Sequence, residues 1–371
     1  MKGGVGRYTS NLVSALRNDA EVEIICDKSN SSHSGDLHNA TSPGDYGNSD
    51  EILRITKEAR PDIVHVQYEA SLYEAVRSSD IWGSRSTLEK FYSKCPVPTV
   101  TTQHTVFARE EYLAFVKESS SGNGKSNIPG MLKKYARSQA LRKFYDQLIG
   151  IGALTTEVIN LSNTSRNIIG RGRVIYIGSE PFPGPMLSKM QLRQELRLPQ
   201  EKLILLAFGH PGSSTGFDIL DRLELPANWV LAIKQTSRGR GTEQPVEVQN
   251  AIHLDSDYFD EQSFSKLLFA CDAVIIPRKL VAASTSGVLF DALAHELPFV
   301  GFDSILFREF ADMGLGLVSK LEPESFSNAI SRLASDYNTF KQNVQQFVPK
   351  MKWSAVASSH LETYRHLLLK S

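Results

Sequence analysis

Cysteine is scarce in this sequence, and the few cysteines present show no metal-ligand spacing. The 371 residues contain three of them, at Cys26, Cys95 and Cys271. None is paired with another at the short intervals typical of zinc sites or disulfide frameworks. Each lies in or beside an apolar run, so we expect reduced, buried thiols in a reducing compartment.

The sequence also lacks an excess of charge and a long hydrophobic run. Lysine plus arginine number 41, as do aspartate plus glutamate, so no net field would attract nucleic acid. The apolar run from Leu267 is broken at Asp272, far short of a membrane span, and no apolar signal region is found at the start. With 41% hydrophobic and 22% charged residues, the composition is typical of a soluble globular protein. We expect a cytoplasmic location.

The length and the alternation of apolar runs with helical segments predict a two-domain α/β protein. A turn-rich stretch around Pro181 and Pro183 marks the linker. We therefore place an N-terminal domain at residues 1–181, a C-terminal domain at 182–349 and a C-terminal helix at 350–371. Short apolar runs predict strands at residues 22–26, 63–66, 148–154, 173–178, 203–209, 230–234, 273–276 and 298–302, with a helix near 156–161.

The sequence opens on a glycine-rich stretch, Gly3-Gly4-Val5-Gly6, that leads into a predicted helix. Such a loop allows the backbone to approach an anionic or sugar ligand closely; the alternative is a plain terminus before a helix. No strand precedes the loop, although in an open α/β sheet the central first strand normally does. We predict that the N-terminal domain lacks its first strand, and we favour a strand upstream of Met1 over an incomplete sheet.

Two predicted strands of the first half end in polar residues. Gln67-Tyr68-Glu69 follows the apolar run at 63–66, and His104 lies at the end of a second predicted strand, at residues 98–105. The carboxyl ends of parallel strands are where ligands bind in open sheets, so these side chains are candidates for a binding or catalytic site. The alternative for a single histidine at a strand end is a hydrogen-bonded structural role.

The segment around residues 273–294 is the strongest local signal of the second half. A buried strand ends at Pro277, and Ser286 then precedes an amphipathic helix that begins near Gly287. Serine is a good N-cap residue. The free N–H groups of Gly287 and Val288, at the positive end of the helix, would favour an anion such as phosphate. The alternative is a helix cap with no ligand.

Basic and apolar residues alternate between Lys133 and Lys143. We favour a solvated helix face for this segment. The alternative is a surface for a membrane or an acidic acceptor.

The order of these motifs resembles the GT-B glycosyltransferases of the large retaining family 4 group. The resemblance extends over nearly the whole chain. It is carried by the glycine loop at residues 3–8, a PDIVHVQ strand at 61–67, the strand end at 102–105, the strand at 174–178, and the segment at 286–294 followed by a strand at 298–300.

The resemblance implies two Rossmann-like domains that face each other across a cleft, with the C-terminal helix packed back on the N-terminal domain. It implies transfer of a sugar from a nucleotide-diphosphate donor to an acceptor hydroxyl with retention, in polysaccharide, glycolipid or glycoconjugate synthesis. The partners would be a nucleotide sugar and a carbohydrate or lipid-linked acceptor, without cofactor, metal or nucleic acid. His104 would be the active-site histidine, Asp291 and the 286–288 turn would bind the donor, and Gly3, Gly4 and Val5 would face the acceptor.

The sequence departs from the family at the donor phosphate. The first of two acidic residues falls on Ala283, and the second, Asp291, is shorter than the usual glutamate. The loop after the first strand of the second domain lacks the usual arginine and lysine, with Thr215 near the lysine position. The candidate replacement cations are Lys234, Arg278 and Lys279. Two alternatives therefore stay open: a non-catalytic GT-B protein that binds a nucleotide sugar or acts as a scaffold, and, ranked last, a sugar-nucleotide epimerase.

Overall fold

The computed structural model describes most of the chain. The described residues are 4–29, 36–73, 86–110, 112–113, 145–146, 149–183, 187–209, 216–235, 246–254, 260–277 and 286–370. Within them the chain forms two compact units. Unit 1 contains the residues up to Ile177 and those from Trp353 onward, and unit 2 runs from Gly178 to Lys352. The sequence placed these boundaries at 181–182 and 349–350.

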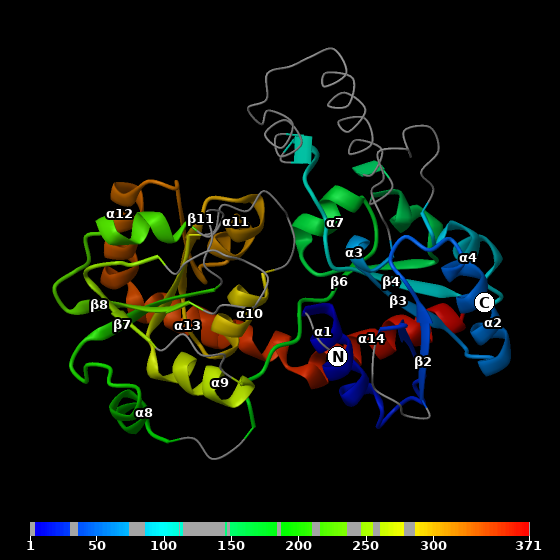
Figure 1. Cartoon of the computed structure of the whole chain (residues 1–371), viewed down its shortest axis with the longest axis horizontal. Helices are drawn as coiled ribbons and strands as arrows, with labels where there is room; N and C mark the ends of the chain where they lie inside the picture. Colours follow the sequence, from blue (N-terminus) through cyan, green and yellow to red (C-terminus); the bar gives the residue numbers. More distant parts are fainter. Residues whose placement is uncertain are drawn as a thin grey trace, which may run out of the picture. The chain divides into compact units, whose positions relative to one another are not determined.

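Unit 1 is built from parallel strands and covering helices (Figure 1). Its larger sheet has the order β3-β4-β5-β6, and a separate parallel pair is formed by β1 and β2. Its elements are α1 (Gly4–Leu16), β1 (Ile24–Asp27), β2 (Leu37–Thr41), α2 (Asn48–Ala59), β3 (Val64–Tyr68), α3 (Ala70–Tyr73), α4 (Glu89–Lys94), β4 (Thr99–Gln103), β5 (Glu157–Asn160), α7 (Asn163–Ile169), β6 (Arg173–Val174) and α14 (Trp353–Leu368). In the described part of unit 1, no strand precedes α1 and β1 pairs with β2 alone.

One stretch of unit 1 corrects the sequence-based assignment. Residues 149–154, which we predicted as a strand, are helical, and β5 lies at Glu157–Asn160, where we predicted a helix. A short apolar run has the same pattern in a buried strand and in a buried helix, so its periodicity does not distinguish the two. The β-branched Val158 and Ile159, both fully buried, fit the strand better.

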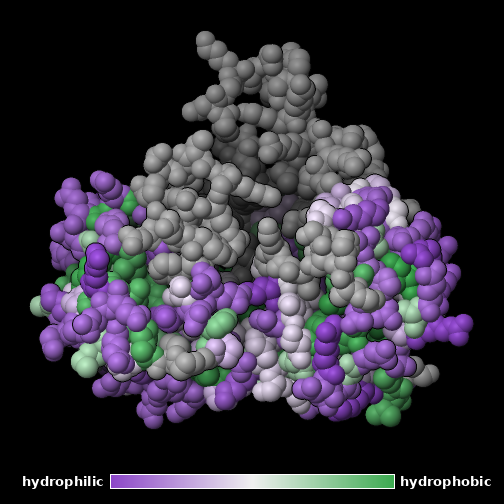
Figure 2. Space-filling view, turned by 60° about the horizontal axis from the view of Figure 1, so that its bottom comes forward, coloured by the Kyte–Doolittle hydropathy of each residue, from purple (hydrophilic) through white to green (hydrophobic). Residues whose placement is uncertain are grey.

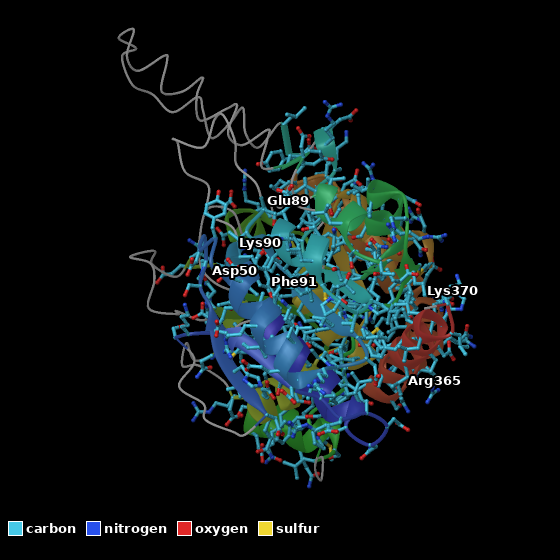
Figure 3. The ribbon with its side chains drawn as sticks, turned by 90° about the vertical axis from the view of Figure 1, so that its right-hand side faces the viewer. Asp50, Glu89, Lys90, Phe91, Arg365 and Lys370 are labelled. Carbon is cyan, nitrogen blue, oxygen red and sulfur yellow. The ribbon has the colours of Figure 1, made fainter. Side chains whose placement is uncertain are left out.

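The last helix of the chain belongs to unit 1. Leu12 and Leu16 of α1 share a buried cluster with Val356 and Leu367 of α14. Arg365 on the exposed side of α14 and Lys370, just beyond the end of the helix, point outward (Figure 3).

A second part of unit 1 joins α2 to α4. Phe91 of α4 is fully buried, and its backbone N–H donates to Ser49 Oγ at 3.0 Å. On the surface, Lys90 forms an ion pair with Asp50 of α2 (Figure 3). Such an exposed pair adds little stability, so the buried contacts of Phe91 and Ser49 hold these helices.

Unit 2 contains one six-stranded parallel sheet in the order β12-β11-β10-β7-β8-β9. Its elements are α8 (Lys189–Glu195), β7 (Leu203–Gly209), η2 (Phe217–Arg222), β8 (Trp229–Gln235), β9 (Ala251–His253), α9 (Glu261–Ala270), β10 (Ala273–Ile276), α10 (Gly287–Ala294), β11 (Phe299–Phe302), α11 (Ile305–Asp312), β12 (Gly316–Ser319), α12 (Pro323–Ser335), α13 (Tyr337–Phe347) and η3 (Val348–Met351). Successive residues of β7 and β10 are buried. Burial on both faces is typical of a parallel sheet covered on two sides, and the predicted α/β class is confirmed.

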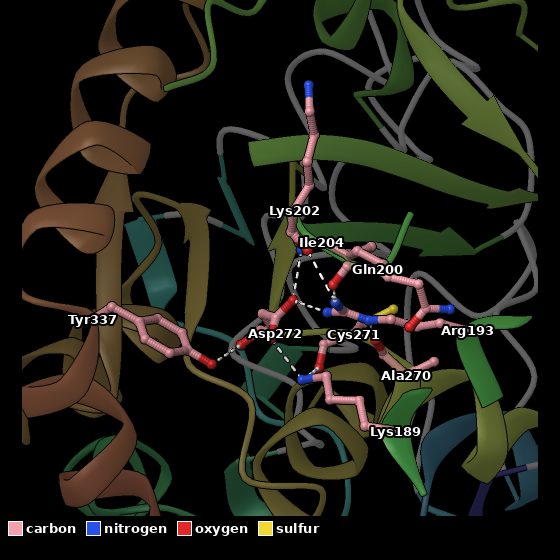
Figure 4. A network of polar contacts seen from close by, with 9 residues as sticks. All are labelled: Lys189, Arg193, Gln200, Lys202, Ile204, Ala270, Cys271, Asp272 and Tyr337. Atoms are coloured by element: carbon pink, nitrogen blue, oxygen red, sulfur yellow. Dashed lines mark hydrogen bonds and ion pairs between the residues drawn. The ribbon is translucent and has the colours of Figure 1, made fainter. Parts of the chain in front are cut away.

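A buried ion-pair network fixes the amino ends of β7 and β10 (Figure 4). Asp272, directly before β10, accepts from Arg193 of α8 at 2.5 Å and from Lys189 at 2.6 Å. The same carboxylate accepts from the backbone N–H of Ile204 at 2.7 Å. The backbone carbonyl oxygen of Asp272 accepts from Tyr337 Oη at 3.1 Å. The network lies at the edge opposite the strand ends where ligands bind, so we assign it to stability.

The described surface is largely polar. Hydrophilic residues cover much of the face seen in Figure 2, and the apolar areas between them are small. In the part of the chain that the structure describes, no helix has the length and apolar character needed to span a membrane. All three cysteines are free thiols, as predicted, with Cys271 buried and the other two partly buried.

Candidate functional site

The carboxyl ends of β3 and β4 bring polar side chains together in unit 1. The two strands pair in parallel with Tyr68 opposite Gln103, so they end at the same level. His104 follows β4, and its backbone N–H donates to the Tyr68 carbonyl at 2.9 Å. The chain therefore places the predicted active-site histidine at the same sheet edge as Gln67 and Glu69.

His104 ends a chain of buried hydrogen bonds that runs to α14. Its Nε2 lies 2.8 Å from Gln67 Oε1, and Gln67 Nε2 lies 3.3 Å from His65 Nε2. His65 Nε2 also lies 2.8 Å from Thr102 Oγ1, and His65 Nδ1 lies 2.6 Å from Tyr364 Oη. Because Gln67 Oε1 can only accept, His104 donates through Nε2, and this contact selects its tautomer. His65 Nε2 contacts both Gln67 Nε2 and Thr102 Oγ1.

Burial keeps these imidazoles neutral. His104 is 8% exposed, and desolvation lowers its pKa to about 3. The pKa of His65 is also far below the usual histidine value, because of burial and then because of nearby His360 and His104. At neutral pH His104 can offer a hydrogen bond but no positive charge.

Tyr8 of α1 packs against this network. Its ring lies 4.9 Å from that of His104 and 5.4 Å from that of Trp353. Its Oη is buried and has no hydrogen-bond partner among the described residues, and burial, followed by nearby Tyr364, raises its pKa. Gly4 and Val5 lie one turn earlier, at the start of α1, where Gly4 is exposed. From Gly4 on, the predicted glycine loop is therefore the first turn of α1, and this helix carries Tyr8 to the His104 network.

In unit 2, α10 begins as predicted at Gly287. Ser286 is its N-cap, and the Ser286 Oγ accepts from the Leu289 backbone N–H at 3.3 Å. The helix follows β10, whose four residues are buried. Gly287 is exposed and Val288 is partly buried, so the first turn is accessible to solvent. This arrangement has the donor geometry and the dipole that an anion needs.

Asp291 lies one turn further along α10 and is partly buried. One of its carboxylate oxygens accepts from Ser179 Oγ at 2.9 Å. Its backbone carbonyl lies 2.7 Å from His295 Nδ1. The carboxylate is therefore held by a residue 112 positions earlier in the chain.

The end of β10 is in close contact with the start of η2. Gly216 has φ +71°, and a Cβ at this position would lie 2.0 Å from the Pro277 carbonyl oxygen. Only glycine fits both the left-handed backbone and this contact. Gly216, at the start of η2, is thereby fixed beside Pro277, at the carboxyl edge of the unit 2 sheet.

Comparisons with known proteins agree with this architecture. Residues 2–156 match the model of Glycosyltransferase Family 4. The fold is similar to sucrose-phosphate synthase from Thermosynechococcus elongatus, with 14% identity, a TM-score of 0.65, and coverage of 100% of this chain and 94% of that one. It is also similar to HepE from Anabaena in complex with UDP-glucose (13%, 0.61, 99% and 97%) and to WaaG, a glycosyltransferase involved in lipopolysaccharide biosynthesis (13%, 0.58, 98% and 96%). No curated protein matches the sequence significantly.

The chain has the GT-B fold, and its residues 2–156 match a glycosyltransferase family model. The fold expected from the sequence motifs is thus confirmed.

Lys234 differs from a solvated surface charge. It lies near the carboxyl end of β8, opposite Phe208 of β7, and is 1% exposed. A buried ammonium is costly without partners, and Lys234 takes part in at least one hydrogen bond, ion pair, ring contact or electrostatic interaction. Its role toward a donor phosphate stays a prediction.

Several predicted site residues lie outside the described residues. These are Gly3, Thr215, Arg278, Lys279 and the basic segment from Lys133 to Lys143. The diphosphate clamp and the membrane-facing patch therefore stay predictions. Among the described residues, no group of three or more His, Cys, Asp or Glu side chains is arranged to hold a metal ion.

The structure adds site residues that the sequence did not single out. Tyr8 lies on the same face of α1 as Leu12 and Leu16, with which it shares a buried cluster. Tyr364 lies 299 positions from its partner His65, and Ser179 is similarly remote from Asp291. No local pattern could have joined these pairs, because only the tertiary fold brings them together.

Proposed function

We propose that this glycosyltransferase transfers a sugar from a nucleoside-diphosphate sugar to an acceptor hydroxyl with retention of configuration. The observation that carries the proposal is the accessible first turn of α10 with the carboxylate of Asp291 one turn behind it. The N–H groups of Gly287 and Val288, capped by Ser286, would bind the diphosphate. Asp291 would accept hydrogen bonds from the ribose hydroxyls.

The donor class is supported by the neighbouring structures. HepE has been crystallised with UDP-glucose and with UDP and glucose. These neighbours share about 13–14% identity with this chain, so they support a uracil nucleotide as the first probe and leave the sugar open.

In the proposed reaction, the bond between the anomeric carbon and the diphosphate oxygen breaks, and the electron pair leaves with the diphosphate. The acceptor oxygen bonds to the same face of the sugar, and its proton passes to the departing phosphate oxygen. Departure needs preorganised positive charge and N–H donors. The α10 turn would supply the donors, and Lys234, Arg278, Lys279 and Thr215 are the proposed additional contacts.

His104 would contact the donor sugar as a neutral hydrogen-bonding group. Its pKa of about 3 excludes a fixed imidazolium near neutral pH. The hydrogen bond from its Nε2 to Gln67 fixes the ring, and Tyr8 packs against it. Gly3, Gly4 and Val5 at the start of α1 would face the acceptor.

We further propose a cytoplasmic enzyme of polysaccharide, glycolipid or glycoconjugate synthesis. It would act without a metal or an organic cofactor. A lipid-linked acceptor would bring it to a membrane surface, with the segment from Lys133 to Lys143 as the contact.

A second candidate is a non-catalytic GT-B protein that binds a nucleotide sugar. The observation that favours it is Ala283, which replaces the first acidic residue of the family pattern. A screen of UDP-, GDP- and ADP-sugars for slow donor hydrolysis distinguishes the two. The enzyme should release the free sugar and the nucleoside diphosphate from one donor, and His104→Ala should abolish this release. Binding of a donor without hydrolysis, even with simple sugar acceptors added, would favour the second candidate.

The proposed clamp has its own test. Replacing Arg278 and Lys279 together by alanine should weaken donor affinity by roughly 10-fold or more, because each charge-assisted contact contributes about 1.5–3 kcal/mol. Unchanged affinity would exclude them as diphosphate contacts.

A further inference from the structure

The segment that opens unit 2 is tied to the proposed donor helix. Ser179 is 5% exposed. Its backbone N–H donates to the Met351 carbonyl at 3.0 Å, and its Oγ donates to Asp291 Oδ1 at 2.9 Å. The serine is therefore fixed through both its main chain and its side chain, which makes it a rigid donor toward the carboxylate.

An aspartate at this position benefits from such a donor. Its side chain rotates about two bonds, and ordering them on binding a ligand costs conformational entropy. A carboxylate has about four lone-pair sites, so a bond from Ser179 restricts its rotation and leaves acceptor capacity for ribose hydroxyls.

A second contact of the same segment offers an internal control. The backbone N–H of Phe182 donates to Ser265 Oγ of α9 at 3.1 Å. Ser265 Oγ lies 2.7 Å from His295 Nε2, and His295 Nδ1 contacts the carbonyl oxygen of Asp291 at 2.7 Å. This path also links the segment to α10, but it ends on the backbone of Asp291 and not on its carboxylate.

We propose that Ser179 is a positioning residue for the donor nucleotide, because its hydroxyl holds the carboxylate of Asp291 in the orientation that accepts ribose hydroxyls. The proposal rests on the proposed function, in which Asp291 binds the ribose. It makes nucleotide affinity depend on a hydroxyl that does not itself contact the ligand.

The experiment titrates UDP, with GDP and ADP in parallel, into the full-length protein by calorimetry. Ser179→Ala should weaken binding of the preferred diphosphate about threefold to tenfold, the range expected for one net hydrogen bond. Ser179→Thr keeps the hydroxyl and should restore affinity to within about twofold, whereas Ser265→Ala should leave it within about twofold. Thermal unfolding of each variant confirms that it is folded.

A double-mutant cycle with Asp291→Ala separates positioning from a general structural effect. If Ser179 acts through Asp291, Ser179→Ala should change affinity less than about twofold in the Asp291→Ala background. In turnover, the donor KM of Ser179→Ala should rise with the dissociation constant, while the acceptor KM stays constant. Equal losses in both backgrounds, or equal losses for Ser179→Ala and Ser265→Ala, would overturn the proposal.

The outcomes also separate this proposal from the proposed function. If the wild-type protein binds no nucleoside diphosphate, the proposed function is wrong and the role of Ser179 is wrong with it. If the wild type binds and Asp291→Ala weakens binding, but Ser179→Ala does not, only the positioning role is wrong.

Discussion

Unit 1 and unit 2 both gather polar side chains at the carboxyl ends of parallel strands, yet the two sets differ in charge. The buried network around His104 in unit 1 consists of imidazoles held neutral, an amide and hydroxyls. Unit 2 contains the buried Lys234, the carboxylate of Asp291 and the start of α10. Neutral hydrogen-bonding groups suit sugar hydroxyls, and charges with helix dipoles suit phosphate and ribose.

The difference extends to stability. Unit 2 is held at its amino edge by a buried carboxylate with two cationic partners. Unit 1 depends on apolar packing and contains buried histidines whose neutral form is favoured by burial. The two units should therefore respond differently to loss of charge and to acid. Three measurements test this difference.

The largest effect should come from Asp272→Ala in unit 2. The substitution leaves Arg193, 6% exposed, without its carboxylate, and removal of one partner of a buried pair costs about 3–5 kcal/mol. Urea unfolding, followed by hydrogen exchange in β7 and β10, measures the loss. The control is Asp303→Ala, which breaks the more exposed pair with Arg308 and should cost at most about 1 kcal/mol. Equal effects of the two substitutions would contradict a stabilising role for the buried network.

A second effect, which depends on pH and not on a substitution, should appear in unit 1 as the pH falls. Burial lowers the pKa of His104 to about 3 and that of His360 to about 4, and His65 also stays neutral when folded. The unfolded chain then binds more protons than the native one between about pH 6.5 and pH 4. Stability is therefore full above pH 6.5 and is lost toward pH 4, by about 1.4 kcal/mol per pH unit for each histidine.

Hydrogen exchange between pH 7 and pH 5, corrected for the intrinsic exchange rate, tests this difference. Protection of β3 and β4 should decrease more steeply than protection of β7 and β8. His360→Gln removes one titrating group and should reduce the slope for unit 1. Parallel loss of protection in both units, unchanged by His360→Gln, would show that the buried histidines are not the cause.

The smallest effect should separate two buried tyrosines of unit 1. Tyr92 Oη lies 2.8 Å from Thr101 Oγ1, so Tyr92→Phe should lower the free energy of unfolding by about 1 kcal/mol. Tyr8 Oη has no hydrogen-bond partner among the described residues, so Tyr8→Phe should be neutral or slightly stabilising. If Tyr8→Phe costs as much as Tyr92→Phe in chemical unfolding, its hydroxyl makes a contact that supports the fold.

The parts of the site that follow from local sequence could be predicted, and the others could not. The start of α10 was predictable because a buried strand, a serine N-cap and an apolar helix face follow one another within about twenty residues. The end of β4 at His104 was predictable because a polar residue lies at the end of a predicted strand. The carboxyl ends of two parallel strands meet at one edge, so Gln67 could also be placed near His104.

Contacts between distant segments could not be predicted, and apolar runs that fit both helix and strand could not be assigned. The bonds from Ser179 to Asp291 and from His65 to Tyr364 depend on how distant segments pack, and serine and tyrosine are too common to mark such contacts. The exchange of helix and strand around residues 149–160 arose because its apolar run fits both structures. Burial of Lys234 was also hidden, because its position near a strand end is equally compatible with an exposed side chain.

The central claim is that α10 of unit 2 binds a nucleoside diphosphate with Asp291 as a ribose contact. Calorimetric titration of UDP into the wild-type protein and into Asp291→Ala tests it most directly. The account predicts one-to-one binding by the wild type and roughly 10-fold or greater weakening in the variant, the loss expected when a charged hydrogen-bond acceptor is removed. Binding of equal strength by both proteins would contradict it.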